Sequence, residues 1–349
     1  MAALNEVLLL FIAYAASLFM AWNIGANDAS NPTDTVVGAG ALSINKAIIL
    51  FSIFAGIGAV MQGWMVMKTL GKGVVSPLGV AGALSAVLAG GLWVLIATLK
   101  GLPVSTSQSI TGGVIGVGLS YVALGLISIG DIRWSIVLTI ILSWLISPAA
   151  SIVLSILLYL LFERIFLRRI YTERITKILR MILIASLVFS AYSFGANDVG
   201  NATGVYVAIT GKYLGLPDVS TRMFLALLGS IGIALGAFTL GRRVIATVAY
   251  KITHLDLLTG MAAEYANALT VWLFTTVPYM LIGYGMPVST THASVSAIIG
   301  VGIARSRSFK GVRWKTVLLI IMSWLLTLPI TIALGFTIHY IMYNILFIQ

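Results

Sequence analysis

The sequence contains no cysteine and few charged residues, and each absence excludes a class of protein. Without cysteine the chain has no disulfide bond, no thiolate metal site and no cysteine nucleophile. Charged residues make up 9% of the 349 positions and hydrophobic residues 60%, whereas a soluble domain carries roughly 25% charged residues. This composition excludes an ordinary soluble protein and indicates one that is surrounded by lipid.

Two further absences concern function. The sequence has no Gly-x-x-x-x-Gly-Lys-Ser/Thr loop for nucleotides and no His-Glu-x-x-His metal pair. These absences argue against an ATP-driven pump and a zinc protease. The formal charge is +11, but the basic residues lie in short segments between apolar runs, where membrane topology places them. Nucleic-acid binding is therefore not expected.

Long apolar runs recur along the whole chain. The runs at 48–67, 135–161 and 317–338 each have more than 18 residues, which is enough for a helix to cross the ~30 Å hydrocarbon layer of a bilayer. We therefore expect an all-α, polytopic membrane protein with about 10–12 transmembrane helices, including broken helices or re-entrant hairpins. The run at 317–348 is too long for one straight crossing, so a tilted or extended helix is expected there.

Two short motifs occur twice in the same order. Gly-Ala-Asn-Asp occupies positions 25–28 and 195–198, and Pro-Val-Ser-Thr occupies positions 103–106 and 287–290. Each Pro-Val-Ser-Thr element is followed by Gly-Val-Gly and then by a Ser-Trp pair inside an apolar run. This order predicts an internal repeat. Its parts are a first membrane repeat at 1–162, a basic linker at 163–180 and a second membrane repeat at 181–349.

The two repeats are expected to have opposite orientations in the membrane. Five crossings in each repeat, an odd number, would invert the second repeat relative to the first, as in many secondary transporters. Sixteen basic residues follow odd-numbered spans, whereas five follow even-numbered spans. Because positively charged loops stay in the cytoplasm, we expect a multi-pass protein of the cell membrane. Its linker would be cytoplasmic and both termini would lie outside.

Asp28 and Asp198 each end an apolar run, close to residues that break helices. Ionisable residues within the hydrocarbon region are costly, and they usually mark a substrate or ion path. The following segments at 31–34 and 200–204 interrupt a helix through proline, glycine and competing side chains. Such a break at membrane depth is tolerated only where it lines a cavity. The alternative, two water-exposed helix ends, does not explain why the same tetrapeptide occurs in both halves.

The Pro-Val-Ser-Thr elements are typical of helix starts that bind anions. Serine and threonine are good N-caps, and proline is tolerated at the first turn. The unpaired N–H groups and the positive dipole end of a helix N-terminus attract an oxyanion. Hydroxyl groups would add neutral donors to the anion. These hydroxyls belong to Ser105, Thr106, Ser107, Ser289, Thr290 and Thr291.

Two other polar residues lie in apolar surroundings. Glu264 is inside the run at 257–277, and the corresponding stretch of the first half, 81–93, has no acid. This carboxylate is either an ion ligand or proton carrier, or it forms a structural hydrogen bond to a neighbouring helix. His292 stands where the first half has Gln108, and we interpret it as a hydrogen-bonding residue.

The duplicated pairing of Gly-Ala-Asn-Asp with Pro-Val-Ser-Thr resembles the PiT-type inorganic phosphate transporters, over nearly the whole chain. The resemblance implies two inverted repeats with helical hairpins that meet near the midplane, and phosphate entry coupled to sodium or to protons. The chain departs from the family pattern at Pro32, at Asp34 and at Ser107-Gln108. By resemblance, substrate and coupling ions would be held by Asn27, Asp28, Asn197, Asp198 and the Ser/Thr clusters at 105–107 and 289–291.

The sequence thus predicts a secondary active transporter, not an enzyme, that imports inorganic phosphate by ion-coupled alternating access. Its expected partners are phosphate and the bilayer, and no organic cofactor is expected. The sequence leaves open whether the protein forms a homo-oligomer. Sodium is favoured over protons because it prefers oxygen ligands. The candidate sodium ligands are Asn27, Asn31, Asn197, Asn201 and Glu264. The alternatives are a sulfate permease of the same fold, an uncoupled anion channel and a membrane enzyme that uses carboxylates for acid–base chemistry.

Overall fold

The computed structural model describes residues 2–72, 74–75, 78–166, 172–215 and 218–345. Within these residues the chain is helical and has no strand. Eight helices are long and apolar enough to cross a membrane, and large apolar side chains such as Phe11, Leu145 and Leu281 are exposed on the outer surface. The expected all-α membrane fold is therefore confirmed.

The two halves of the chain have the same order of elements. The first half consists of α1 (Ala2–Asp28), α2 (Ser30–Gly38), α3 (Ile44–Gln62), α4 (Trp64–Lys72), α5 (Val80–Leu99), α6 (Thr106–Ala123), the 3-10 turn η1 (Ile129–Asp131) and α7 (Trp134–Phe166). The second half consists of α8 (Glu173–Thr203), η2 (Gly204–Tyr206), α9 (Val207–Leu214), α10 (Asp218–Thr239), α11 (Gly241–Lys251), α12 (Leu257–Ile282), α13 (Thr290–Ser306), η3 (Phe309–Gly311) and α14 (Trp314–Ile345).

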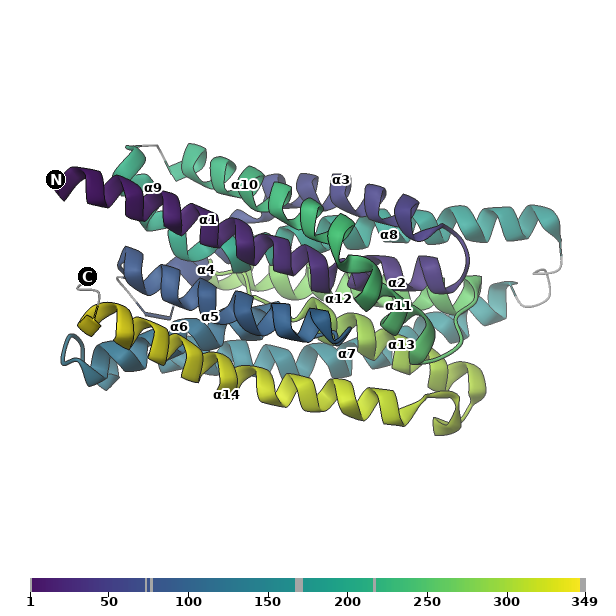
Figure 1. Ribbon diagram of the computed structural model, residues 1–349. Helices are drawn as coiled ribbons and strands as arrows, with labels where there is room; N and C mark the ends of the chain where they lie inside the picture. Colours follow the sequence, from purple (N-terminus) through teal and green to yellow (C-terminus); the bar gives the residue numbers. More distant parts are fainter. Residues whose placement is uncertain (1, 73, 76–77, 167–171, 216–217, 346–349) are drawn as a thin grey trace.

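The termini and the connection between the halves lie at opposite ends of the bundle. Figure 1 shows the N and C labels at one end, whereas α7 and α8 project at the other end. Of the expected linker, residues 163–166 belong to α7 and residues 173–180 to α8. The side of the membrane that each end faces remains a prediction from the charge count.

Helices α5 and α6 form one hairpin, and α12 and α13 form the other. The second arm of each hairpin, α6 or α13, lies in the core and packs against the other half of the chain. Helix α6 contacts α14 and α5, and α13 contacts α7 and α12. Small residues allow this close approach: a Cβ atom at Gly116 would lie 2.2 Å from the carbonyl oxygen of Ile332. Because α6 and α13 are buried almost throughout, neither has to be apolar enough to face lipid, and neither is among the eight apolar helices.

Glycine also sets the distance between the broken helices and their neighbours. A Cβ atom at Gly25 of α1 would lie 1.8 Å from the carbonyl oxygen of Ile233 in α10. At the equivalent crossing, a Cβ atom at Gly195 of α8 would lie 1.8 Å from the carbonyl oxygen of Ala55 in α3. The first residue of each Gly-Ala-Asn-Asp motif is therefore a packing residue, and it fixes the position of the polar residues that follow.

The long C-terminal apolar run forms one helix. Helix α14 has 32 residues and contains Pro329. At 1.5 Å per residue it is longer than the ~30 Å hydrocarbon layer is thick, so it must be tilted or extend beyond the layer. The run predicted at 317–348 is helical up to Ile345, and residues 346–349 lie outside the described part.

The predicted orientation can be tested with single cysteines, since the natural chain has none. Thr172, at the start of α8, is exposed, and so is Gly130, in η1 at the opposite end of α7. We expect Thr172→Cys to react with a membrane-impermeant thiol reagent only after the cells are opened. Gly130→Cys is expected to react in intact cells. The reverse pattern would contradict the charge-based orientation.

Candidate functional site

The two Gly-Ala-Asn-Asp motifs meet in the core of the bundle. Helix α1 ends at Asp28 and α2 begins at Ser30, and Asp198 lies on α8 a short distance before η2. Both carboxylates are fully buried, and they interact electrostatically. The hydroxyl of Thr106, the first residue of α6, donates to Asp28 Oδ2 at 2.6 Å and lies 3.3 Å from Asp198 Oδ1. One hydroxyl therefore bridges the carboxylates of the two halves.

Further hydroxyl and amide groups complete this centre. Thr291 Oγ1, on α13, donates to Asp28 Oδ1 at 3.1 Å. Asn201 Nδ2 donates to Asp198 Oδ1 at 2.9 Å, and Asn201 Oδ1 is a buried oxygen that has no hydrogen-bond partner among the described residues. Asn31 Nδ2 lies 3.1 Å from the hydroxyl of Thr290 and 3.2 Å from that of Thr291. The carboxylate of Asp28 thus accepts a hydroxyl from each half, Thr106 from α6 and Thr291 from α13.

Asn27 and Asn197 connect the broken helices to the hairpin turns. Asn27 Oδ1 accepts a hydrogen bond from the backbone N–H of Val104 at 2.9 Å, and its amide nitrogen donates to the carbonyl oxygen of Leu102 at 3.0 Å. Asn197 Oδ1 accepts from the N–H of Val288 at 3.1 Å, and its amide nitrogen donates to the carbonyl oxygen of Val288 at 2.8 Å. The sequence suggested these two asparagines as sodium ligands. In this structure their side chains hydrogen-bond to the backbone of the hairpin turns.

The serines of the Pro-Val-Ser-Thr elements cap the hairpin helices. Ser105 Oγ accepts from the N–H of Gln108 at 3.2 Å, and Ser289 Oγ accepts from the N–H of His292 at 3.1 Å. Both elements are therefore helix starts, as the motif predicts. The remaining N–H groups of each first turn have no carbonyl partner within their own helix.

The two hairpin turns also bond to each other. Ser107 Oγ donates to the carbonyl oxygen of Val288 at 2.9 Å. The hydroxyl of Thr291, whose one hydrogen is shared between Asp28 and this contact, lies 3.0 Å from the carbonyl oxygen of Val104. Ser107 also accepts from Asn201 Nδ2 at 3.0 Å. The six Ser/Thr positions thus divide into two caps and four side chains that face the centre.

Two tryptophans support the hairpin turns, and the sequence interpretation did not assign them a role. Trp144 Nε1 of the first half donates to the carbonyl oxygen of Pro287 at 3.2 Å, and Trp324 Nε1 of the second half donates to that of Pro103 at 3.1 Å. The His292 ring packs against that of Trp324, with centroids 4.0 Å apart and the two planes tilted by 34°. The repeated Ser-Trp pair was the sequence signal for this arrangement, since each copy holds the hairpin of the other half.

Glu264 is not part of the central cluster. The hydroxyl of Thr35, on α2, donates to Glu264 Oε2, and Ser294 Oγ, one turn into α13, donates to Asp34 Oδ2 at 2.7 Å. Asp34 and Glu264 are fully buried and interact electrostatically. They form a second acidic pair, of which sequence reasoning had named Glu264 as a candidate ligand and Asp34 only as an unusual residue.

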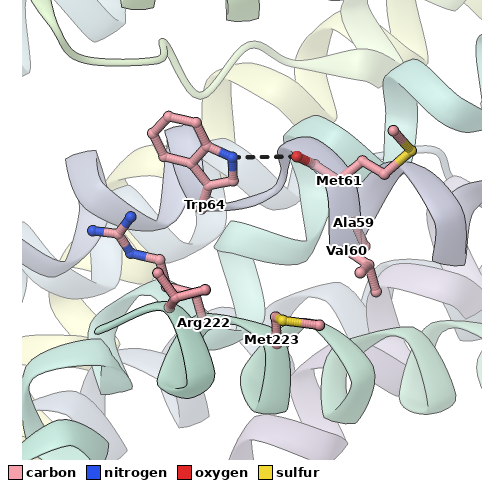
Figure 2. Close-up of a pocket in the computed structure, with 7 residues that line it drawn as sticks. Ala59, Val60, Met61, Trp64, Arg222 and Met223 are labelled. Atoms are coloured by element: carbon pink, nitrogen blue, oxygen red, sulfur yellow. Dashed lines mark hydrogen bonds between the residues drawn. The ribbon is translucent and has the colours of Figure 1, made fainter. Parts of the chain in front are cut away.

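A hollow on the outer surface has a different character. Figure 2 shows its lining residues, which come from α3, α4 and α10. Its volume is about 340 Å³. Most of its lining is apolar. Its basic residue, Arg222, hydrogen-bonds to Asp218 and lies over the ring of Trp64, 5.6 Å from its centroid. The guanidinium of Arg222 is thus already engaged, and the lining of the hollow includes neither Asp28 nor Asp198. The hollow therefore does not extend the central site.

Comparison with known proteins gives consistent matches along the chain. A family model described as the phosphate transporter family matches residues 24–335. A candidate phosphate permease of Pyrococcus abyssi is 31% identical, over 92% of this chain and 95% of that protein. The chloroplastic inorganic phosphate transporter 2-1 of Arabidopsis thaliana is 28% identical, over 96% of this chain and 73% of that protein. A solved structure described as a sodium-dependent phosphate transporter is 30% identical, with a TM-score of 0.84 over 97% of this chain and 99% of that one.

Proposed function

Because the chain belongs to the phosphate transporter family, we propose that it imports inorganic phosphate together with sodium, by alternating access around Asp28 and Asp198. The observation that carries this proposal is the meeting of two broken helices and two hairpin helix starts around buried carboxylates. This arrangement supplies groups for an anion and groups for a cation at one place.

The hairpin helix starts can bind the phosphate. Helices α6 and α13 begin at Thr106 and Thr290, so their unpaired N–H groups and positive dipole ends are directed at the same buried centre. The hydroxyls of Thr106, Ser107, Thr290 and Thr291 provide further donors. Neutral donors of this kind bind an oxyanion without a lysine or arginine.

The carboxylates make cation binding a condition for phosphate binding. In the part of the chain that the structure describes, neither Asp28 nor Asp198 takes part in a salt bridge. Two like charges 4 Å apart repel by about 4 kcal/mol at an effective dielectric constant of 20. A phosphate anion beside two ionised carboxylates would be repelled accordingly, so bound sodium ions are needed to compensate the charge. Asn201 Oδ1, which no described residue hydrogen-bonds, is a suitable additional ligand.

The buried centre also requires movement during transport. Asp28, Asp198 and Thr106 have relative exposures of 0%, 0% and 1%, so phosphate reaches them only after the surrounding helices separate. The hydrogen bonds from Ser107 to Val288 and from Thr291 to Val104 join the two hairpin turns. We propose that these bonds break when either hairpin opens its side of the site.

Transport in proteoliposomes tests the substrate and the coupling ion together. We expect labelled phosphate to accumulate above its external concentration when an inward sodium gradient is imposed. An acid-outside gradient without sodium is expected to drive little uptake. Equal uptake under the acid gradient would contradict sodium coupling, and dissipation of a phosphate gradient without accumulation would indicate a channel. Stronger accumulation of labelled sulfate than of phosphate would contradict the substrate.

A further inference from the structure

The hollow beside Trp64 and Arg222 is one part of a longer groove between α3 and α10. A further hollow, of about 380 Å³, lies along the same two helices, and Val60 and Met61 line both hollows. Figure 2 shows Arg222 and Trp64 on one side of the first hollow, opposite Val60 and Met61. In Figure 1, α10 begins at the end of the bundle that carries the termini and runs beside α3. The two hollows therefore form one α3–α10 groove that extends from that end toward the middle of the bundle.

The length and the lining of the α3–α10 groove suit one acyl chain. Its lining extends along α10 from Val219 to Ser230, which is about 16 Å of helix at 1.5 Å per residue. One leaflet contributes about 15 Å to the hydrocarbon layer of a bilayer. Apart from Arg222 and Ser230, the described lining residues are apolar. Ser230 donates its hydroxyl to the carbonyl oxygen of Ala226 at 2.7 Å, so this end of the groove presents no free hydroxyl.

A pair of opposite charges lies at the other end of the groove, where α10 begins. Arg222 donates to Asp218, the first residue of α10. The carboxylate side chain is 59% exposed and the guanidinium side chain 24%, so both charges can be reached from outside. Trp64 lies against Arg222, and Tyr279 packs on Trp64 with ring centroids 4.6 Å apart. Tryptophan and tyrosine are enriched where a membrane meets water, which places the charge pair at the level of lipid headgroups.

This charge pair determines which headgroup fits. Lipid chains are as apolar as the groove, so placing one there gains little over leaving it in the bilayer. A retained lipid must therefore be held by its headgroup. A lipid phosphate is attracted by Arg222 but repelled by Asp218, unless a positive group of the same headgroup lies beside the carboxylate. The ammonium of ethanolamine supplies that charge and, like the ammonium of lysine, three hydrogen-bond donors.

The neighbouring rings and the nearby lysine are already engaged. Lys68 donates to the carbonyl oxygen of Gly283 at 3.1 Å and lies over the rings of Tyr279 and Tyr284. It lines neither hollow. The ring of Trp64 carries a guanidinium and packs against Tyr279. Choline is recognised by a cage of free aromatic faces, and its quaternary ammonium has no N–H to donate, so this end of the groove favours ethanolamine over choline.

We propose that the α3–α10 groove binds one molecule of phosphatidylethanolamine. Its phosphate lies at Arg222, its ammonium lies at Asp218 and one acyl chain lies between the two helices. A phospholipid with a negative headgroup that lacks an ammonium would leave the carboxylate of Asp218 without a partner and beside a like charge. Lipid binding at this groove is independent of the transported anion and of the coupling ion, so it can be tested apart from transport.

The bound lipid would contact both helices that position the central site. Helix α3 passes Gly195 of α8 at Ala55, and α10 passes Gly25 of α1 at Ile233. These glycines begin the two Gly-Ala-Asn-Asp motifs. A chain lodged between α3 and α10 would therefore support both crossings from the outer surface of the bundle.

Native mass spectrometry of the purified protein tests this site. The natural chain is mixed with phosphatidylethanolamine, phosphatidylglycerol and phosphatidylcholine that carry the same acyl chains. We expect one phosphatidylethanolamine per chain to be retained about tenfold more strongly than either competitor, because one hydrogen bond to a charged group changes affinity by about that factor. This lipid should also raise the thermal midpoint more than the others, since a ligand that binds only the folded state stabilises it.

Single variants test each part of the proposed site. Val60→Trp fills the groove where the two hollows join and should abolish retention. Arg222→Gln should lower retention of phosphatidylethanolamine to that of phosphatidylcholine, and Asp218→Asn should strengthen retention of phosphatidylglycerol. The matched controls are Leu145→Trp, at an exposed apolar position of α7, and Lys177→Gln, at another exposed ion pair. Both controls should leave lipid retention unchanged.

Three results would overturn the proposal. One is retention by the natural chain of phosphatidylglycerol or phosphatidylcholine as strongly as phosphatidylethanolamine. Another is retention of phosphatidylethanolamine that survives both Val60→Trp and Arg222→Gln in proteins that elute as single folded species. The third is a dimer of the natural chain that Val60→Trp converts into monomers, which would assign the groove to a second copy of the chain.

Discussion

Replacement of Asp28 or Asp198 by asparagine is expected to lower sodium-driven phosphate uptake by about 100-fold or more. Each carboxylate accepts hydrogen bonds from the hairpins or the broken helices and provides charge for a cation. Removal of one partner from a buried charged pair costs about 3–5 kcal/mol, and each 1.4 kcal/mol is a factor of ten in binding. Initial rates of labelled phosphate uptake at fixed sodium concentration measure this effect.

The same variants test how phosphate is distinguished from sulfate. Near neutral pH phosphate still carries a proton, and an ionised carboxylate can only accept a hydrogen bond, so Asp28 or Asp198 can bond to a phosphate O–H but repels sulfate. An amide donates to either anion. We expect at least one of the two asparagine variants to lose roughly tenfold of its preference for phosphate over sulfate. The reason is that an unpaired buried polar group costs about 1–3 kcal/mol. Glu173→Gln, at an exposed acid paired with Lys177, is the control.

Normal uptake and unchanged selectivity in both aspartate variants would contradict these roles. The carboxylates would then be structural residues at the helix breaks. Loss of uptake with unchanged selectivity would support cation binding and reject the acceptor role in discrimination. The two measurements therefore separate the roles.

The second large effect concerns the glycines at the helix crossings. Gly58→Ala, on α3, is expected to destabilise the protein by about 3 kcal/mol, at the upper end of overpacking effects. The added Cβ atom would lie 2.0 Å from the carbonyl oxygen of Tyr192 on α8, and a backbone oxygen cannot move aside like the end of a side chain. The thermal midpoint of the purified protein should fall. It is measured as the temperature at which half of the monodisperse elution peak is lost.

Gly56→Ala is the matched control on the same helix. Its Cβ atom would meet the side chain of Ser230 at 3.8 Å, which is an ordinary contact. Since alanine favours a helix over glycine by about 1 kcal/mol, this variant should be neutral or more stable. A similar decrease in stability for both variants would contradict the close crossing of α3 and α8.

Much of this architecture could be predicted from the sequence because the repeat made each weak signal appear twice. The family, the all-α membrane fold and the helix starts at Thr106 and Thr290 were predicted correctly from the duplicated motifs. Apolar runs identified the lipid-facing helices, since lipid contact requires a continuous apolar surface. Helices α6 and α13 have no such surface, so hydropathy alone does not identify them as membrane helices.

The separate structural roles of the residues within each motif could not be predicted from the sequence. In Gly-Ala-Asn-Asp, the structure assigns packing to Gly25, attachment of the hairpin turn to Asn27 and the site itself to Asp28. The role of Trp144 and Trp324 depends on a contact between the two halves. The pairing of Asp34 with Glu264 could not be predicted either, because residues 230 positions apart give no local sequence pattern.

The central claim is that phosphate binds at Asp28 and Asp198 only when sodium compensates their charge. Equilibrium binding of labelled phosphate to the purified protein, with sodium replaced stepwise by choline at constant ionic strength, tests this claim without transport. We expect the affinity to fall at least tenfold when sodium is absent, and to become insensitive to sodium in the Asp28→Asn/Asp198→Asn variant. Phosphate affinity in the natural chain that is the same with and without sodium would contradict the claim.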